Sequence, residues 1–256
     1  MTGDACGRRI CLPCVDSTNN WMKQHIHELE YGAVCYTMNQ TAGRGRFGRR
    51  WMAAEGKSLA MSMLLRPECD VAVLPAVSAV FGLAAAEALR ELTGLDLKIK
   101  WPNDIVCAVG DNRAKICGIL CDICFDPVVI IAGIGINLYQ TGFDFAEADL
   151  PCAGSLTSMG ASVPPVDTLI TKIETGFLSL YDQFIGGGFS PVRLRYEALC
   201  DTIGKKVCIH AVSGGVIAEG IAVGIDNNGR LLINNSDGVR AVDSGEVTLS
   251  PPDNSM

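Results

Sequence analysis

The chain has 256 residues, of which 48% are hydrophobic and 19% charged, and its formal net charge at pH 7 is -7. These proportions exclude a disordered chain and are those of one large domain, or one domain with a small appendage. This net negative charge is also unfavourable for binding the phosphates of a nucleic acid.

No targeting or membrane segment is evident in the sequence. The N-terminal stretch MTGDACGRRICLPC contains no apolar run of signal-peptide length. The longest stretch without charge, Val71 to Ala86, is interrupted by a proline, a serine and a glycine, and it falls short of the ~20 apolar residues of a membrane span. We therefore expect a cytoplasmic protein without a membrane span, in which this stretch is a buried core helix.

Helix and strand signals alternate through the first part of the chain. The polar run DSTNN (16–20) can cap open N–H groups, which predicts a helix from about Trp21 to Leu29. Apolar periodicity then predicts further elements in chain order: strands over 33–40 and 58–67, a helix from about Pro75 to Leu92, and strands over 95–101, 115–125 and 128–138. The last strand is apolar enough to be central in a sheet.

The character of the chain changes towards its C-terminus. Apolar residues at helical spacing predict an amphipathic helix over 166–184, ended by Gly186–Gly188, and a shorter helix follows around Val192 to Leu199. After Gly204, short apolar segments alternate with the turns SGG, DNNG and NSDG, which predicts a small β-barrel of about fifty residues. We therefore expect two domains, residues 1–203 and 204–256.

Twelve cysteines raise the question of a metal site. Two CxxC pairs, Cys11/Cys14 and Cys121/Cys124, could together form a four-thiolate zinc site. The second pair, however, lies in the apolar run CGILCDICF, where cysteine behaves as a small hydrophobic residue. The three histidines are scattered along the chain. We expect reduced, structural cysteines and no metal held by the protein itself.

The segment QTAGRGRFGRRW (40–51) concentrates arginine and glycine in an otherwise acidic chain. Its GRGRFG part matches GxGxxG, but the residues that follow lead into a strand rather than a helix, which argues against a dinucleotide site. No GKS or GKT closes a Walker A motif. Glycines interleaved with guanidinium groups suggest a loop that folds over phosphate oxygens. A solvated basic loop or an RNA-binding tract is the alternative, and this segment alone leaves both open.

Four further motifs resolve this question. DSTN (16–19), KWPND (100–104), KICGIL (115–120) and GIGIN (133–137) each have an ordinary structural interpretation, such as a helix cap, a turn or an edge lysine. Together with the arginine loop, however, they stand in the order found in biotin protein ligases. The chain resembles that family from about Asp16 to Leu249.

The resemblance implies an α+β fold. It comprises a catalytic domain with a central mixed sheet flanked by helices, of the class II synthetase (SH2-like) type, and a small C-terminal SH3-like β-barrel. It also implies a ligase that converts biotin and ATP to biotinyl-5′-AMP and pyrophosphate, with Mg²⁺ held through the ATP phosphates. Biotin then passes to one lysine of a biotin carboxyl carrier domain. A lipoate or octanoate ligase or transferase of the same fold is the alternative.

The resemblance also assigns roles to individual residues. For biotin they are Ser17, Thr18, Asn19, Gln40, Arg44, Gly45, Arg46 and Lys115; for ATP they are Arg46, Arg49, Trp51 and Asn137. Arg46 and Lys115 are assigned to catalysis at the meeting point of carboxylate and phosphate. Asp104 is assigned to the incoming amine, with a structural turn role as the alternative. The link from Asp104 to Lys115 is longer than the short hairpin expected.

Family members that repress transcription carry an N-terminal helix-turn-helix domain. About fifteen residues precede DSTN here, too few for three helices. The resemblance therefore implies the enzyme-only type, which binds no DNA, and it leaves a homodimer open.

Overall fold

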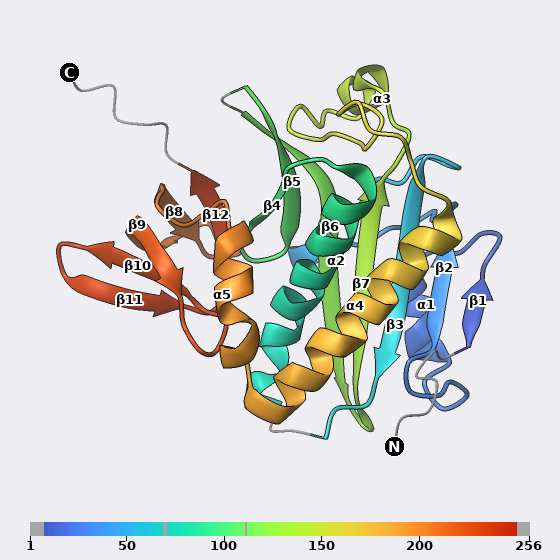
Figure 1. Ribbon diagram of the computed structural model, residues 1–256, viewed down its shortest axis with the longest axis horizontal. Coiled ribbons are helices and arrows are strands. Elements are labelled where there is room, and N and C mark those ends of the chain that lie inside the picture. The colour runs from blue at the N-terminus through green and yellow to red at the C-terminus, as the bar shows by residue number, and fades with distance from the viewer. Residues whose placement is uncertain (1–7, 69–70, 111, 250–256) are drawn as a thin grey trace.

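The apolar strands of the first part of the chain assemble into a seven-stranded sheet with the order β1-β2-β3-β7-β6-β5-β4 (Figure 1). The computed structural model describes residues 8–68, 71–110 and 112–249. The strands are β1 Arg9–Cys11, β2 Val34–Thr37, β3 Ser58–Leu65, β4 Leu97–Lys100, β5 Asp104–Val109, β6 Asn112–Phe125 and β7 Val128–Asn137. Only the β1–β2 pair is parallel among these described strands. Strand β7 stands in the middle of this order and is buried from Val129 to Asn137, as its apolar sequence predicts for a central strand.

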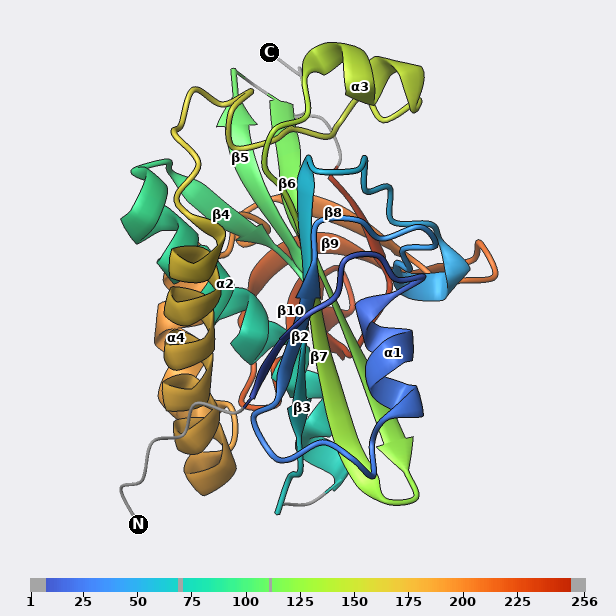
Figure 2. The same ribbon diagram turned by 90° about the vertical axis from the view of Figure 1, so that its right-hand side faces the viewer.

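Helices cover both faces of this sheet. In Figure 2, α2 (Val77–Thr93) and α4 (Val166–Gly187) lie on one side of the strands and α1 (Thr18–Gln24) lies on the other. The ring centres of Phe81 in α2 and Phe177 in α4 are 4.5 Å apart, so the two long helices share one apolar layer. The remaining helical segments are short: η1 Arg46–Gly48, η2 Val71–Ala76, α3 Gly142–Glu147 and α5 Ser190–Leu199.

The segment Val71–Thr93, formed by η2 and α2, is long and apolar enough to cross a membrane by length and composition alone. However, 67% of the apolar 18-residue stretch within it is buried inside the protein. Its residues belong to the same hydrophobic cluster as the inner face of the sheet. We therefore interpret it as the core helix that the sequence predicts.

After α5 the chain forms a second, antiparallel sheet with the order β11-β10-β9-β8-β12. Its strands are β8 Lys206–His210, β9 Val216–Ile225, β10 Leu231–Asn235, β11 Gly238–Val242 and β12 Glu246–Leu249. This sheet packs against the KWPND segment, where Trp101 Nε1 donates to the carbonyl of Gly229 at 3.2 Å. The contact brings the C-terminal sheet to the edge of the large one.

Five elements differ from the sequence-based expectations. Helix α1 begins at Thr18 and ends at Gln24, earlier than predicted, because Ser17 already occupies the N-cap position with an extended backbone. The long link after KWPND is itself structured, since β5 pairs with β6 and β6 begins at Asn112 rather than Lys115. Strand β1 and helix α3 were not predicted. The ends of the two expected domains, residues 1–7 and 250–256, lie outside the described residues.

Candidate functional site

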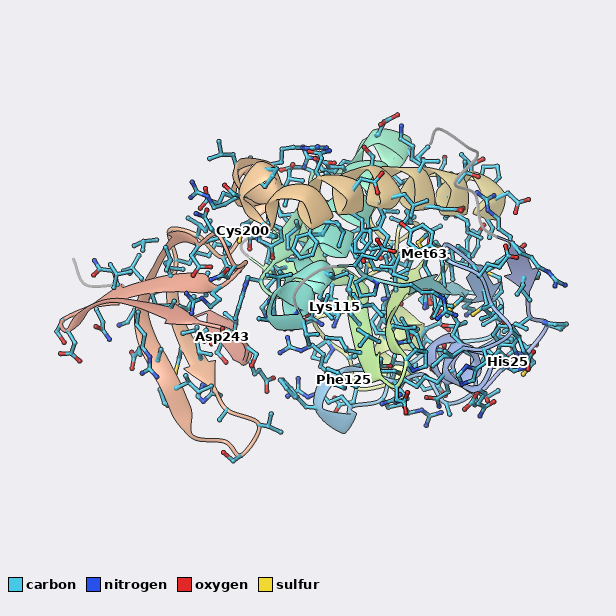
Figure 3. All side chains as sticks on the ribbon, turned by 90° about the horizontal axis from the view of Figure 1, so that it is seen from below. His25, Met63, Lys115, Phe125, Cys200 and Asp243 are labelled. Carbon is cyan, nitrogen blue, oxygen red and sulfur yellow. The ribbon has the colours of Figure 1, made fainter. Side chains whose placement is uncertain are left out.

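All twelve residues that the motifs single out line one cavity of roughly 330 Å³. Its walls come from the start of α1, the arginine loop, KWPND, β6, β7 and the turn between β11 and β12. In Figure 3, Lys115 lies between the C-terminal sheet, which carries Asp243, and the part of the chain that carries His25. Segments far apart in sequence therefore converge on one site.

Hydroxyl and amide groups form one end of the cavity. The side-chain oxygen of Gln40 accepts a hydrogen bond from the backbone N–H of Thr18 at 3.0 Å. The Thr18 hydroxyl oxygen lies 2.7 Å from Ser62 Oγ. Because the oxygen of Gln40 is held by the backbone, its amide nitrogen is left as a donor. The hydroxyl of Ser17 makes no helix-capping hydrogen bond. This end can therefore recognise a compact polar group such as a urea.

Asn19 joins α1 to the sheet. Its Nδ2 donates to the carbonyl of Leu120 and to Asp122 Oδ2, both at 3.0 Å, and its Oδ1 accepts from Ser62 Oγ at 2.6 Å. It lies directly over Gly133, where a Cβ atom would come within 2.1 Å of Asn19 Oδ1. Both amide protons of Asn19 are thus used within the protein, so this residue shapes the cavity floor and offers a ligand at most one acceptor lone pair.

Asp122 was not identified from the sequence. Its carboxylate accepts from Asn19 and forms ion pairs with Lys23 Nζ at 2.9 Å and Arg44 NH1 at 3.7 Å. Arg44 also donates to Asn20 Oδ1 at 2.9 Å, which ties the arginine loop to α1. The alternation of a strand could have revealed Asp122, since it lies two residues after Leu120, which lines the cavity.

The arginine loop contacts KWPND and the C-terminal sheet. Arg46 donates to Asn103 Oδ1 at 2.7 Å and to the carbonyl of Gly245 at 3.3 Å. Arg49 forms an ion pair with Glu246, and the backbone N–H of Gly45 donates to Arg49 O at 2.7 Å. Burial lowers the pKa of the Arg46 guanidinium, which indicates a partly desolvated cation.

The partners of these arginines were also missed at the sequence level. Asn103 Nδ2 donates to the carbonyl of Ile119 at 2.9 Å, which turns its oxygen towards Arg46. The hydrogen bond from Arg49 lowers the pKa of Glu246, so this carboxylate is a stable anionic partner at neutral pH. The C-terminal sheet therefore helps to position the loop.

Lys115 and Asp104, to which the motifs assign separate roles, form an ion pair with Nζ and Oδ1 2.7 Å apart. They lie on the neighbouring strands β6 and β5, where the register shifts between Ile105 and Val106. A bulge of this kind changes the direction of nearby side chains. The lysine thus has a carboxylate partner already within the protein.

Trp51 forms part of the cavity wall across the glycines of β6 and β7. A Cβ atom at Gly118 would come within 2.9 Å of the Trp51 ring, and one at Gly135 within 2.5 Å. Lys115 Nζ lies 5.4 Å from the centre of the same ring. Gly118 of KICGIL and Gly135 of GIGIN are therefore required by the close approach of an aromatic side chain.

Among the described residues, no group of three or more His, Cys, Asp or Glu side chains could hold a metal ion. Cys11 and Cys14 are exposed, whereas Cys121 and Cys124 are half-buried. Burial raises the pKa of the Cys121 thiol to about 12, which suppresses its thiolate form.

Thiol reactivity should follow this burial. At pH 8, iodoacetamide should alkylate the exposed Cys11, Cys14 and Cys152 before the buried Cys35 and the half-buried Cys121, whose pKa values are both raised to about 12. Mass spectrometry of peptides after timed labelling gives the order, and all twelve cysteines should react after denaturation. Labelling of native Cys121 as fast as Cys14 would contradict this, as would a stoichiometric zinc adduct lost on Cys121→Ser.

The chain is similar to known proteins over both sheets. The model of the Biotin/lipoate A/B protein ligase family matches residues 11–137, and that of the Biotin protein ligase C terminal domain matches residues 202–250. The Bifunctional ligase/repressor BirA of Bacillus subtilis is 31% identical over 221 residues, which are 85% of this chain and 66% of BirA. The Biotin--[acetyl-CoA-carboxylase] ligase of Paracoccus denitrificans is 30% identical over 92% of this chain and 98% of its own length.

The fold is also similar to that of a solved structure. The Biotin protein ligase from Aquifex aeolicus in complex with biotin and ATP aligns with a TM-score of 0.80 and 28% identity, over 95% of this chain and 98% of that one. The large mixed sheet with its helices and the C-terminal antiparallel sheet are thus the architecture of these enzymes.

Proposed function

We propose, because the chain belongs to the biotin protein ligase family, that it activates biotin as biotinyl-5′-AMP and transfers it to one lysine of a biotin carboxyl carrier domain. The observation that carries this proposal is the cavity itself. It unites a hydroxyl and amide end, suited to the ureido group of biotin, with a cluster of cations suited to phosphate.

The first step brings the biotin carboxylate to the α-phosphate of ATP, and both groups are anions. Preorganised cations stabilise the charge that develops there, and they act more strongly in a partly desolvated site. Arg46, Arg49 and Lys115 line the same cavity, and Arg46 is half-buried, which lowers the pKa of its guanidinium. We assign Arg46 and Arg49 to the phosphates and Lys115 to the bond-forming carboxylate.

We propose that magnesium enters this site with the nucleotide. The carboxylates Asp104 and Glu246 of the cavity are each paired with a cation, and the described residues offer no cluster that could hold a metal by itself. Mg²⁺ bound to ATP phosphates neutralises the charge of the departing pyrophosphate. The protein's own part is to position the phosphates with its arginines.

The second step requires an uncharged lysine on the carrier domain. A lysine with a pKa near 10.4 is protonated at pH 7, and removing that proton costs roughly 4–5 kcal/mol. Asp104 is held by Lys115 at 2.7 Å. A biotin carboxylate that reaches Lys115 competes for this lysine, and Asp104 is then released to accept or orient the incoming amine.

We further propose how the chain divides into domains and which fold type each domain has. Residues 1–203 would form the catalytic domain, of the class II synthetase type, and residues 204–256 a C-terminal SH3-like barrel. The contacts of Arg46 with Gly245 and of Arg49 with Glu246 support a direct part for the C-terminal sheet in the site.

A panel of acids tests the proposed activity. With ATP, biotin should trigger pyrophosphate release, whereas lipoate and octanoate should not. The match to the biotin protein ligase C-terminal domain and the relatives named biotin ligases favour biotin over these alternatives. Release with lipoate or octanoate, and none with biotin, would refute the proposal.

The arginine loop should change its dynamics when both ligands bind. Inside the loop, Gly45 and Arg49 make backbone hydrogen bonds, to Arg49 O and Arg46 O, and segments with few such bonds exchange quickly. Amide hydrogen exchange over residues 42–50 should slow when biotin and ATP are added together, while β3 stays unchanged. Equal exchange of the loop with and without ligands would contradict this prediction.

Asp122 should affect biotin binding through its neighbours. Asp122→Asn weakens the contacts that orient Asn19 and hold Arg44, so the Kd for biotin should rise about tenfold in calorimetry. Lys23→Met removes another ion pair of the same carboxylate without touching either residue, and its Kd should stay within about twofold of wild type. Equal weakening by both substitutions would mean that the carboxylate has only a general structural role.

A further inference from the structure

One buried amide of the cavity lies outside all five motifs. Gln140 lies three residues beyond β7, is 2% exposed and lines the cavity. Its side-chain oxygen Oε1 is buried and has no hydrogen-bond partner in the part of the chain that the structure describes. Leaving a buried acceptor unpaired is unfavourable, which marks this atom as a candidate contact for a ligand.

The orientation of this amide follows from its neighbours. Asn137 Nδ2 donates to the carbonyl oxygens of Gly154 at 2.9 Å and Lys115 at 3.4 Å. Carbonyl oxygens only accept, so the nitrogen of Asn137 must face them and its oxygen must face Gln140. Gln140 Nε2 donates to that oxygen at 3.1 Å and also to Ser58 Oγ. The nitrogen of Gln140 is therefore fixed, and Oε1 is the atom left over.

The two amides together offer a ligand only hydrogen-bond acceptors. All four amide protons of Asn137 and Gln140 are directed to partners within the protein. What remains is Oε1 of Gln140 and one lone pair on Oδ1 of Asn137, both acceptors. A group that brings N–H donors fits here, whereas a carbonyl would place its lone pairs against these oxygens.

This pair of acceptors lies beside the wall assigned to the nucleotide base. Asn137 is two residues beyond Gly135 on β7, so both face the same side of the sheet, and Trp51 lies against Gly135. Adenine carries an exocyclic amino donor on its six-membered ring where guanine carries a carbonyl acceptor.

We propose that Gln140 is a specificity-determining residue for the nucleotide, and that its side-chain oxygen accepts a hydrogen bond from the 6-amino group of adenine. The same oxygen rejects 6-oxopurine nucleotides. This inference rests on the proposed function, because it identifies how that function selects ATP.

A nucleotide series tests it by calorimetry in the presence of biotin. The wild-type protein should bind ATP about tenfold more tightly than purine riboside triphosphate, which lacks the amino group, and about a hundredfold more tightly than inosine triphosphate. In Gln140→Met, which keeps the chain length but has no acceptor oxygen, the preference for ATP over purine riboside triphosphate should fall about tenfold. Ser58→Ala removes a partner of Gln140 but keeps both acceptors, so the wild-type preference should persist.

Each preference is a ratio within one protein, so a partly inactive preparation does not distort it. A Gln140→Met protein that keeps the full preference, while wild-type protein still releases pyrophosphate with biotin and ATP, would overturn the inference alone. If that variant fails to fold, the wild-type series decides, and equal binding of ATP and inosine triphosphate would overturn it. A protein that binds none of the three nucleotides would overturn the inference and the proposed function together.

Discussion

Replacing Arg46 with alanine should slow biotin-dependent pyrophosphate release by about ten- to a hundredfold, because it removes a charge-assisted contact to phosphate. Arg46 is partly desolvated and donates hydrogen bonds to Asn103 and to the carbonyl of Gly245, which direct its guanidinium into the cavity. Single-turnover measurements of pyrophosphate release give the size of the effect.

The second half-reaction is the control for this variant. When purified biotinyl-5′-AMP is supplied, transfer to an acceptor lysine should suffer less, because no pyrophosphate has to be expelled. Asn103→Ala leaves the guanidinium in place but removes the partner that directs it, so the same step should slow by a smaller factor. An Arg46→Ala protein impaired equally in both steps would mean that this arginine only organises the loop.

Lys115→Met should reduce adenylate formation by about a hundred- to a thousandfold, the usual cost of losing a group aimed at developing charge. The substitution keeps the length of the side chain and its contact with Trp51 but removes the cation. Quenched-flow measurement of enzyme-bound biotinyl-5′-AMP reports the step directly.

The ion pair with Asp104 requires a second variant, because Lys115→Met leaves that carboxylate without its partner. The double variant Lys115→Met with Asp104→Asn removes both charges and restores local neutrality. If the lysine acts on the reacting groups, adenylate formation stays slow in the double variant. Recovery to near the wild-type rate would show that the unpaired carboxylate, not the missing cation, caused the defect. Asp104→Asn alone should slow transfer more than activation.

Much of the fold could be predicted because the pattern of apolar residues is local. The buried run of β7 and the periodicity of α4 are each visible in a short window. Strand β1, with three residues, and helix α3, with six, are too short to give such a signal. The segment of β5 looked like a link because its strand character depends on pairing with β6.

The motifs located the site well but not its internal contacts. Residues assigned by motif converge on one cavity, whose lining draws on the start of α1, the arginine loop, the turn between β4 and β5, and strands β6 and β7. The partners that hold them come from elsewhere in the chain. Arg49 and Glu246, for example, are 197 residues apart, and no local pattern connects them. Likewise, only the structure shows that both amide protons of Asn19 are already donated within the protein and that Asp104 pairs with Lys115.

The most direct test of the central claim is a single-turnover reaction followed by mass spectrometry of the small molecules and of an acceptor carrier domain. With biotin and ATP but no acceptor, enzyme-bound biotinyl-5′-AMP should accumulate. After addition of the carrier domain it should disappear as one acceptor lysine gains biotin, and replacement of that lysine by arginine should abolish the transfer. A carrier domain biotinylated without ATP, or a protein that forms no adenylate from biotin and ATP, would contradict the account.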